Sequence, residues 1–401
     1  MKIALLGVED LLGRLPEVLA ADDVEIIVAG PVGSYLTRSR FVDQYLELTP
    51  SQQGQTWSAT IIEHAHELSS LAADWYILGS DPLGRAIADS DLDEFTKQTL
   101  LPARKPEALP LVGSKVGLAQ LMAQAGITEP VTRVAVSSAQ LAEILETVTF
   151  PVMVKADLGA SGVSVRRVNS LQDAAIPAAW FPVIVQDFIS GPSISVEALF
   201  VDGTLRGWLY SQALAFSAKN GPSSVRRFLD PPADDFVASL NAVGELSGLN
   251  GFFNCTLIWN IETQSHYLFE MDARPNAWFQ FGPELGVDWT ALMRGDKVPN
   301  SPRVGPRGRV IHLYPRAVSS AIRRGQPWRA YPWMLRLPGT YRSRNRRDQA
   351  VNSRERALVV AAVRALALAP LHRVYALLPT RARRLSKQLL TRSGPVSASG
   401  D

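Results

Sequence analysis

One segment, Tyr267–Trp278 (YLFEMDARPNAW), constrains the fold of this 401-residue chain most strongly. In an extended strand the side chains alternate between two faces, so Glu270, Asp272 and Arg274 are predicted to share one face. Neighbouring carboxylates repel each other unless a cation lies between them, and oxygen ligands at this spacing suit Mg²⁺. Arg274 adds a planar group that binds phosphate or carboxylate. The alternative is an edge strand with an ordinary surface ion pair.

The length and composition indicate a globular protein of two or three domains. The single cysteine, Cys255, excludes an internal disulfide and indicates a reducing compartment, so we expect a cytoplasmic protein. Because Cys255 lies in an apolar run, a buried structural thiol is favoured over a nucleophile. The N-terminal run Met1–Gly7 resembles a first strand rather than a signal peptide, and no stretch is long and apolar enough to predict a membrane span.

Charge is distributed unevenly along the chain. Residues 301–401 contain 21 Lys or Arg and 3 Asp or Glu, whereas residues 1–300 contain 20 and 35. The sequence therefore predicts an acidic body followed by an arginine-rich C-terminal region.

Residues 1–100 alternate between short apolar runs and helical patterns. Strands are predicted at 2–6, 24–29 and 75–78, and helices at 12–20 and 59–71. This alternation favours a small parallel α/β unit. Neither of the glycine-rich nucleotide-binding fingerprints occurs in it, so no nucleotide is assigned to this unit.

A helix at 118–125 follows a proline-rich stretch, and Ser114 is predicted to cap it. Lys115 falls in its first turn, where a cation opposes the helix dipole. Lys115 is therefore either solvated or placed to bind an anion.

Two β-rich runs, 150–155 and 163–168, predict a hairpin with a tip of small residues. Gly159, Ser161 and Gly162 in this tip would let backbone N–H groups approach phosphate oxygens, and Lys155 beside it supplies a charge for the same phosphates. A plain flexible hairpin is the alternative. A strand is predicted at 181–189, a hairpin at 193–201 and 205–214 with Asp202-Gly203 as its turn, a helix at 232–249 and a strand at 252–259.

The order of these features resembles the ATP-grasp superfamily, in the branch of carbamoyl-phosphate synthase, biotin carboxylase and uncharacterised carboxylate–amine ligases. The resemblance covers residues 1 to about 300, and the E-x-[ND]-x-R-P match at Glu270–Pro275 carries most of it. It implies an α/β, α+β ATP-grasp fold with four parts: a parallel α/β domain (1–105), a small lobe with a hinge (106–190), a large lobe with the magnesium site (191–315) and a basic helical C-terminal region (316–401).

The resemblance also implies roles for individual residues in an ATP-dependent, ADP-forming ligase that activates a carboxylate as an acyl phosphate for attack by an amine. ATP would be contacted by Lys115 and Lys155, by a flap at Gly159, Ser161, Gly162 and Val163, by a hinge at Gln186, Asp187 and Phe188, and by Glu197 and Asn276. Glu270 and Asp272 would hold Mg²⁺, which Mn²⁺ could replace, and Arg274 with Lys155 would act in catalysis.

Three positions depart from the family pattern. Asp272 stands where the second metal ligand is usually Asn, and Thr256 stands where an earlier strand commonly supplies another oxygen ligand. Ser193 occupies the usual position of the ribose-binding carboxylate, with Glu197 as its substitute. These departures leave open an alternative, a degenerate ATP-binding scaffold without catalysis.

The C-terminal region combines arginines with aromatic and apolar residues, including a helical pattern at 354–369 with an apolar stripe. It could be a solvated helical lid, lie on an anionic membrane surface at the inner face, or bind nucleic acid or an acidic partner. Among the functional alternatives the membrane surface is preferred, because apolar residues accompany the arginines. Residues 393–401 are predicted to be disordered.

Overall fold

A computed structural model describes residues 1–313 except 8–11, 13, 128–129, 160–163 and 217–221. The described strands form three sheets, one of four parallel strands, one of four antiparallel strands and one of six antiparallel strands. The predictions for residues 316–401, for helix 354–369 and for the tail lie outside the described residues. No helix among the described residues is long and apolar enough to cross a membrane.

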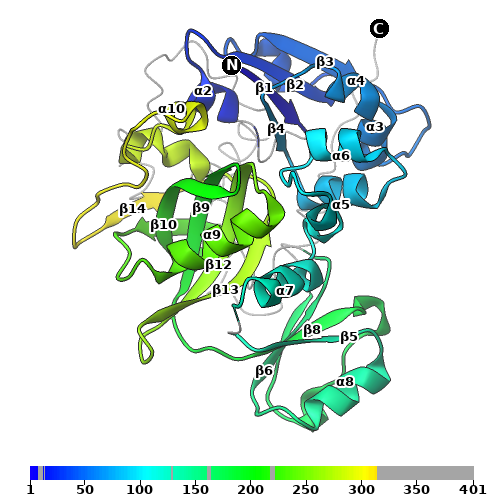
Figure 1. The fold of residues 1–401 in the computed structure, drawn as a ribbon, viewed down its shortest axis with the longest axis vertical. Helices are drawn as coiled ribbons and strands as arrows, with labels where there is room; N and C mark the ends of the chain where they lie inside the picture. The colour runs from blue at the N-terminus through cyan, green and yellow to red at the C-terminus, as the bar shows by residue number, and fades with distance from the viewer. Residues whose placement is uncertain (8–11, 13, 128–129, 160–163, 217–221, 314–401) are drawn as a thin grey trace, which may run out of the picture. The chain divides into compact units, whose positions relative to one another are not determined.

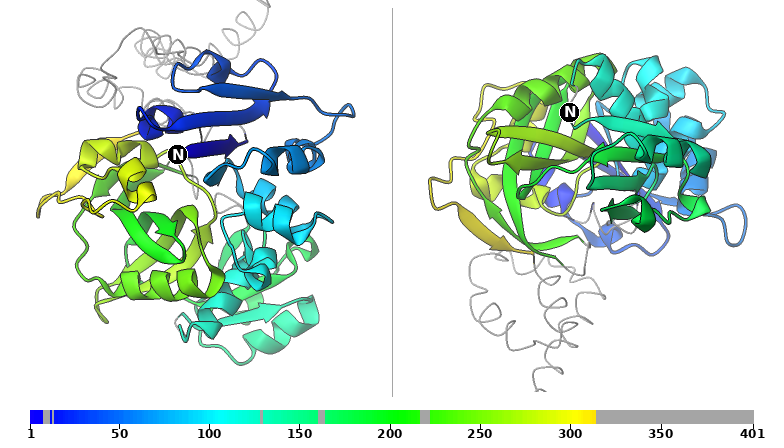
Figure 2. Two further views of the ribbon diagram at one scale, coloured as in Figure 1. Left: turned by 45° about the horizontal axis from the view of Figure 1, so that its top comes forward. Right: turned by 90° about the horizontal axis from the view of Figure 1, so that it is seen from below.

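The first sheet is parallel, with strand order β3-β2-β1-β4 (Figure 1; Figure 2, left). Its strands are β1 (Lys2–Leu6), β2 (Glu25–Pro31), β3 (Gln44–Leu48) and β4 (Trp75–Leu78). Its helices are α2 (Leu15–Leu19), α3 (Trp57–Glu63), α4 (Ala65–Ser69), α5 (Asp81–Asp89) and α6 (Glu94–Leu100). The predicted parallel α/β unit is confirmed, and the helical pattern predicted at 59–71 corresponds to two helices, α3 and α4. His64 has φ −96° and ψ 8°, which ends α3 and begins α4.

Helix α7 (Lys115–Gln124) begins after Ser114, as the sequence predicts. The Ser114 hydroxyl accepts a hydrogen bond from Gly117 N at 2.8 Å. Leu118, Leu121 and Met122 of this helix belong to a hydrophobic core that also contains side chains of the parallel sheet and the six-stranded sheet. Packing of its apolar side therefore fixes α7 between these elements.

The four-stranded antiparallel sheet has its own core. Its order is β5-β8-β6-β7, with β5 (Thr132–Ala135), β6 (Val152–Ala156), β7 (Val165–Val168) and β8 (Val183–Asp187). Helix α8 (Ser138–Leu145) packs on one face, where alternate strand residues such as Val152, Val154 and Val185 are buried (Figure 1). The predicted strands at 150–155 and 163–168 do pair as a hairpin. We call this unit the small lobe.

The six-stranded sheet, which we call the large lobe, has the order β13-β12-β9-β10-β11-β14. It contains β9 (Ser193–Val201), β10 (Thr204–Phe216), β11 (Ser223–Phe228), β12 (Gly251–Asn260), β13 (Ser265–Asp272) and β14 (Arg309–His312), with α9 (Asp235–Ser247) and α10 (Trp289–Arg294). Asp202 and Gly203 join β9 to β10 with φ of 48° and 82°, the backbone of the predicted two-residue hairpin turn. Cys255 is fully buried, as predicted.

The two faces of the large sheet differ in polarity. One face packs against α9, and its residues Val196, Phe200 and Phe253 belong to the same hydrophobic core as Leu118 of α7. On the other face, a polar stretch that includes Glu197, Asn254 and Asp272 interrupts an apolar layer. This polar stretch contains the candidate site.

Candidate active site

Strand β13 presents the two predicted metal ligands. In the pairing with β12, Glu270 lies opposite Thr256 and Asp272 lies opposite Asn254. The strand ends at Asp272, so Arg274 is beyond it rather than in the same strand. Its guanidinium nevertheless returns to the site, where Nη2 lies 2.9 Å from Asp272 Oδ2. The structure therefore brings the two carboxylates and the arginine together, although a turn rather than strand alternation places Arg274.

Lys115 reaches the same carboxylates from the first turn of α7. Its Nζ lies 3.3 Å from Glu270 Oε1 and donates to the backbone carbonyl of Gly159 at 3.0 Å. Asp157 holds this helix end, because its Oδ1 accepts from Val116 N at 2.9 Å and from the Ser114 hydroxyl at 2.7 Å. A carboxylate at a helix N-terminus is favourable, so Asp157 positions Lys115 beside the two predicted metal ligands.

Lys155 lies in β6 and is almost completely buried, with 8% of its surface exposed. Its Nζ donates to Gln186 Oε1 at 2.7 Å and lies 4.6 Å from the centre of the Phe269 ring. Burial lowers the pKa of Lys155 to about 8, while the negative charge of Glu270 raises it. Among the described residues Lys155 forms no ion pair. Its positive charge is therefore available to an anion that binds in the site.

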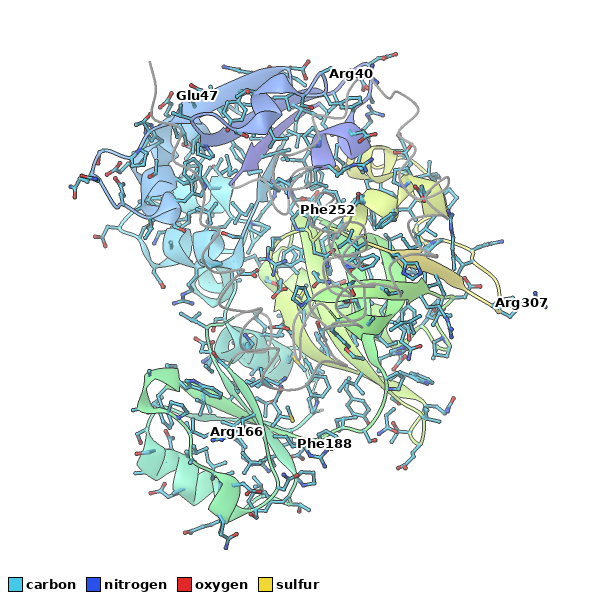
Figure 3. The ribbon with its side chains drawn as sticks, turned by 180° about the vertical axis from the view of Figure 1, so that it is seen from behind. Arg40, Glu47, Arg166, Phe188, Phe252 and Arg307 are labelled. Carbon is cyan, nitrogen blue, oxygen red and sulfur yellow. The ribbon has the colours of Figure 1, made fainter. Side chains whose placement is uncertain are left out.

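The predicted hinge residues face in different directions. Gln186 faces Lys155, and its Nε2 donates to the Thr132 hydroxyl at 3.0 Å. Asp187 forms an ion pair with Arg133 at 3.3 Å, and its backbone N–H donates to the carbonyl of Val131. The ring centre of Phe188, a residue labelled in Figure 3 in the small lobe, lies 4.1 Å from the guanidinium carbon of Arg167. Only Gln186 of this set contacts a predicted phosphate-binding residue.

The flap is partly outside the structural description. Gly159 is described with φ 148°, and a Cβ there would approach Ser164 Oγ to 3.0 Å, so the close turn favours glycine. Ser161, Gly162 and Val163 lie outside the described residues, and their predicted role stays a prediction.

Asp81, the first residue of α5, joins the site from the parallel α/β unit. Its Oδ2 accepts from Arg274 Nε at 2.7 Å, while its Oδ1 is buried without a hydrogen-bond partner among the described residues. Burial raises the pKa of Asp81, and the positive charge of Arg274 opposes that effect. Burial, followed by the negative charges of Asp81 and Glu270, also raises the pKa of Asp272 to about 8, against the opposing charge of Arg274.

Glu197 is not positioned as a ribose ligand, and this corrects the sequence-based assignment. It is fully buried in β9, where Oε1 lies 2.5 Å from Arg226 Nη1 and accepts from Asn254 Nδ2 and Asn276 Nδ2, both at 3.1 Å. The carboxylate has no exposed surface and receives three donors on Oε1, so that oxygen is part of the protein's internal network, while Oε2 is buried without a hydrogen-bond partner among the described residues. We therefore remove Glu197 from the nucleotide-binding set.

Asn276 is fixed at both ends of its amide. Its Oδ1 accepts from Trp278 N at 2.8 Å, and its Nδ2 donates to Glu197. One amide hydrogen remains for a ligand, and the contact of Asn276 with the transferred phosphate stays a prediction.

The donor set fits a magnesium ion that shares its ligands with a nucleotide. Within the described part of the chain, no three His, Cys, Asp or Glu side chains are grouped as a metal site. Glu270 and Asp272 therefore provide two carboxylates, and Mg²⁺ commonly takes its remaining ligands from phosphates and water. A divalent cation would also relieve the repulsion that raises the pKa of Asp272.

Sequence reasoning missed three residues of this region, Asp81, Asp157 and Asn254, and it predicted Arg226 to bind an anionic substrate, whereas Arg226 pairs with buried Glu197. Asp81 follows the carboxyl end of a parallel strand, a position where ligand sites often lie, and this signal could have indicated it. Asn254 lies two residues before Thr256 and so shares its face. Asp157 carries no comparable local signal.

Comparisons with known proteins agree with this architecture. Residues 113–213 match the family model described as a RimK-like ATP-grasp domain. The fold is similar to N5-carboxyaminoimidazole synthetase from Staphylococcus aureus complexed with ADP, at 12% identity over 78% of this chain and 80% of that chain, with a TM-score of 0.56. It is also similar to a biotin carboxylase complex from Campylobacter jejuni, at 16% identity over 74% and 72% of the two chains and a TM-score of 0.54.

A third similar structure is carboxyaminoimidazole ribonucleotide synthase from Aspergillus clavatus complexed with ATP, at 14% identity over 75% and 79% of the two chains and a TM-score of 0.55. The search of curated proteins gave no significant match. Residues 113–213 thus match an ATP-grasp family, and the fold of the chain is similar to that of these solved structures.

Proposed function

We propose that the protein is an ATP- and Mg²⁺-dependent ligase that activates a carboxylate as an acyl phosphate for attack by an amine. One observation carries this proposal: two lysines from separate elements converge on one acidic strand. Lys115 contacts Glu270, and Lys155 lies over Phe269, the preceding residue. Cations beside a pair of carboxylates form a site for a phosphate chain and its metal.

The reaction would proceed in two steps. A substrate carboxylate oxygen attacks the γ-phosphorus of ATP, forming an acyl phosphate and releasing ADP. An amine then attacks the acyl carbon, the C–O bond breaks, and phosphate leaves as the amide forms and the amine loses a proton. Lys115, Lys155 and Arg274 would stabilise charge on the transferred phosphoryl group, and Glu270 and Asp272 would hold the Mg²⁺ that neutralises the phosphates.

The nucleotide would lie between the predicted binding residues of the small lobe and those of the large lobe. Gln186 and Phe188 belong to the proposed adenine-binding hinge, and Gly159, Ser161, Gly162 and Val163 form the proposed flap. Exclusion of water by such a flap would protect the labile acyl phosphate. The similar structures with ADP or ATP support the choice of nucleotide.

Incubation with ATP, Mg²⁺ and pooled carboxylic acids and amines tests the proposal. We expect acid-dependent release of ADP, capture of the acyl phosphate by hydroxylamine and a condensed product detected by mass spectrometry. Glu270→Ala should abolish these signals, whereas a change in the exposed Glu262, at the turn before β13, should not. Equal turnover of Glu270→Ala and wild type would refute the metal assignment.

A nucleotide-binding scaffold without catalysis is the second candidate, because Thr256 stands opposite Glu270 where relatives are expected to supply a further oxygen ligand. It predicts ATP binding by calorimetry without turnover for any acid–amine pair.

The four-part division of the chain and the membrane-binding role of residues 316–401 also remain proposals. Pelleting with anionic but not neutral vesicles would support the latter.

A further inference from the structure

We infer that Asn254 supplies the magnesium ligand from β12, at a position different from Thr256. This inference rests on the proposed function, since it concerns the same metal. Its basis is the arrangement of Glu197, Asn254 and Asp272, which lie in one row across β9, β12 and β13.

The register places Asn254 directly beside a predicted metal ligand. Asn254 pairs with Asp272 on one side and with Glu197 on the other. Directly opposed residues of antiparallel strands have Cβ atoms about 5 Å apart, so their side chains can share one small ligand. Asn254 is 8% exposed, which keeps its amide within the site rather than in bulk water.

The hydrogen bond to Glu197 determines which end of the Asn254 amide faces the metal-ligand strand. An ionised carboxylate only accepts hydrogen bonds, so the group 3.1 Å from Glu197 Oε1 must be the Nδ2 amine. The oxygen of the planar amide then points away from β9. Among the described residues no group donates to this oxygen, and an amide oxygen is a suitable ligand for a hard cation.

Glu197 orients Asn254 but is not itself the ligand. Its Oε1 already receives hydrogen bonds from Arg226, Asn254 and Asn276, and the ion pair with Arg226 balances its charge. The pair therefore holds the amide in one orientation, as residues behind metal ligands commonly do.

Thr256 has no comparable support. It lies opposite Glu270, and the β12–β13 register shifts between Thr256 and Leu257. No described residue makes a side-chain hydrogen bond that would orient its hydroxyl. Asn254 is thus held in place for the metal, and Thr256 is not.

Mn²⁺ binding measured by electron paramagnetic resonance, in the presence of a non-hydrolysable ATP analogue, tests this inference with the full chain. We expect Asn254→Ala to weaken Mn²⁺ binding by at least about tenfold, and Thr256→Ala to leave it nearly unchanged. The reverse order, or no effect of Asn254→Ala, would overturn the inference. Failure of the wild-type complex to bind Mn²⁺ would instead refute the proposed function itself.

Asn254→Cys separates ligation from a purely structural role. A thiolate prefers a soft metal, so this variant should gain Cd²⁺ affinity relative to Mn²⁺ and show a thiolate-to-cadmium absorption band. Thr256→Cys is the matched control and should show neither change, and buried Cys255 is common to both. Loss of Mn²⁺ binding with no gain in Cd²⁺ preference would contradict a ligand role for Asn254.

Discussion

Two buried cations, Lys155 in the small lobe and Arg226 in the large lobe, have opposite surroundings. They are 8% and 6% exposed, respectively. Arg226 Nη1 forms an ion pair with Glu197 Oε1 at 2.5 Å, and the guanidinium carbon lies 4.8 Å from the centre of the Trp278 ring. Lys155 contacts only a neutral amide and an aromatic ring among the described residues.

This difference is expected if Arg226 maintains the structure and Lys155 binds an anionic ligand. Removing a charge from water is costly, and Glu197 offsets that cost for Arg226 within the protein. For Lys155 the only opposing effect is the charge of Glu270, which forms no ion pair with it, and burial lowers the pKa of Lys155 to about 8. A bound phosphate would provide the missing charge, which is why strongly shifted groups concentrate at functional sites.

The largest effect is expected from Arg226→Met. It leaves Glu197 buried without its counterion, and the free energy of unfolding should fall by about 3–5 kcal/mol in a denaturant titration. The double variant Glu197→Gln with Arg226→Met should recover much of this loss, because no charge remains buried. A single-variant loss below about 1 kcal/mol would remove the distinction between the two cations.

Lys155→Met should reduce turnover by about 10²–10³-fold, since it removes a cation that stabilises the transferred phosphoryl group. The free energy of unfolding of the nucleotide-free protein should be unchanged or higher, because burial disfavours the charged lysine. Exposed Lys297→Met is the matched control and should change neither quantity. A marked loss of stability in Lys155→Met would assign Lys155 to the same structural class as Arg226.

In the absence of divalent metal, nucleotide affinity should fall as the pH rises above about 8; with Mg²⁺ present, ionisation of Asp272, whose pKa is also raised to about 8, would act in the opposite direction. Below that pH, Lys155 of the free protein is already charged, and binding takes up no proton. Above it, phosphate binding must first protonate the amine, so affinity should decrease by up to about tenfold per pH unit until the pKa of the complex is reached. Calorimetry in buffers of different ionisation enthalpy would show the proton uptake. A flat profile for wild type, equal to that of Lys155→Arg, would contradict this.

The smallest effect is expected from Arg133→Ala. The Arg133–Asp187 ion pair spans 3.3 Å, and its side chains are 33% and 39% exposed. Water screens such a pair, so the free energy of unfolding should change by less than about 1 kcal/mol, and turnover should stay near that of wild type. A large loss of nucleotide affinity would show that Asp187 acts in the hinge through its side chain.

Local patterns in the sequence were sufficient for much of the fold. Ser114 was predicted to cap a helix, Asp202-Gly203 to form a hairpin turn, and three short apolar runs to form strands of a parallel sheet. Each prediction depends on residues close together in the chain, where backbone preferences act directly. The split between α3 and α4 was missed, because the amphipathic pattern continues across His64. A pattern of apolar residues cannot reveal one residue with a non-helical backbone.

The candidate site was predicted less completely. Glu270 and Asp272 follow from strand alternation, but Asp81 and Arg274 are 193 residues apart and only folding brings them together. Glu197 was predicted to bind the ribose of ATP because it lies close to the hinge in the sequence. Its actual partners, Arg226, Asn254 and Asn276, come from other strands and a loop.

The sequence by itself identified the candidate groups of the site, namely two carboxylates, two lysines and an arginine in an order that resembles an ATP-grasp chain. The tertiary structure decided which charges are already balanced within the protein. Strand β9 buries Glu197 against Arg226, whereas the small lobe buries Lys155 against Gln186 and Phe269. Desolvation and pairing depend on packing in three dimensions, so residues of the same charge acquire different roles that no local pattern specifies.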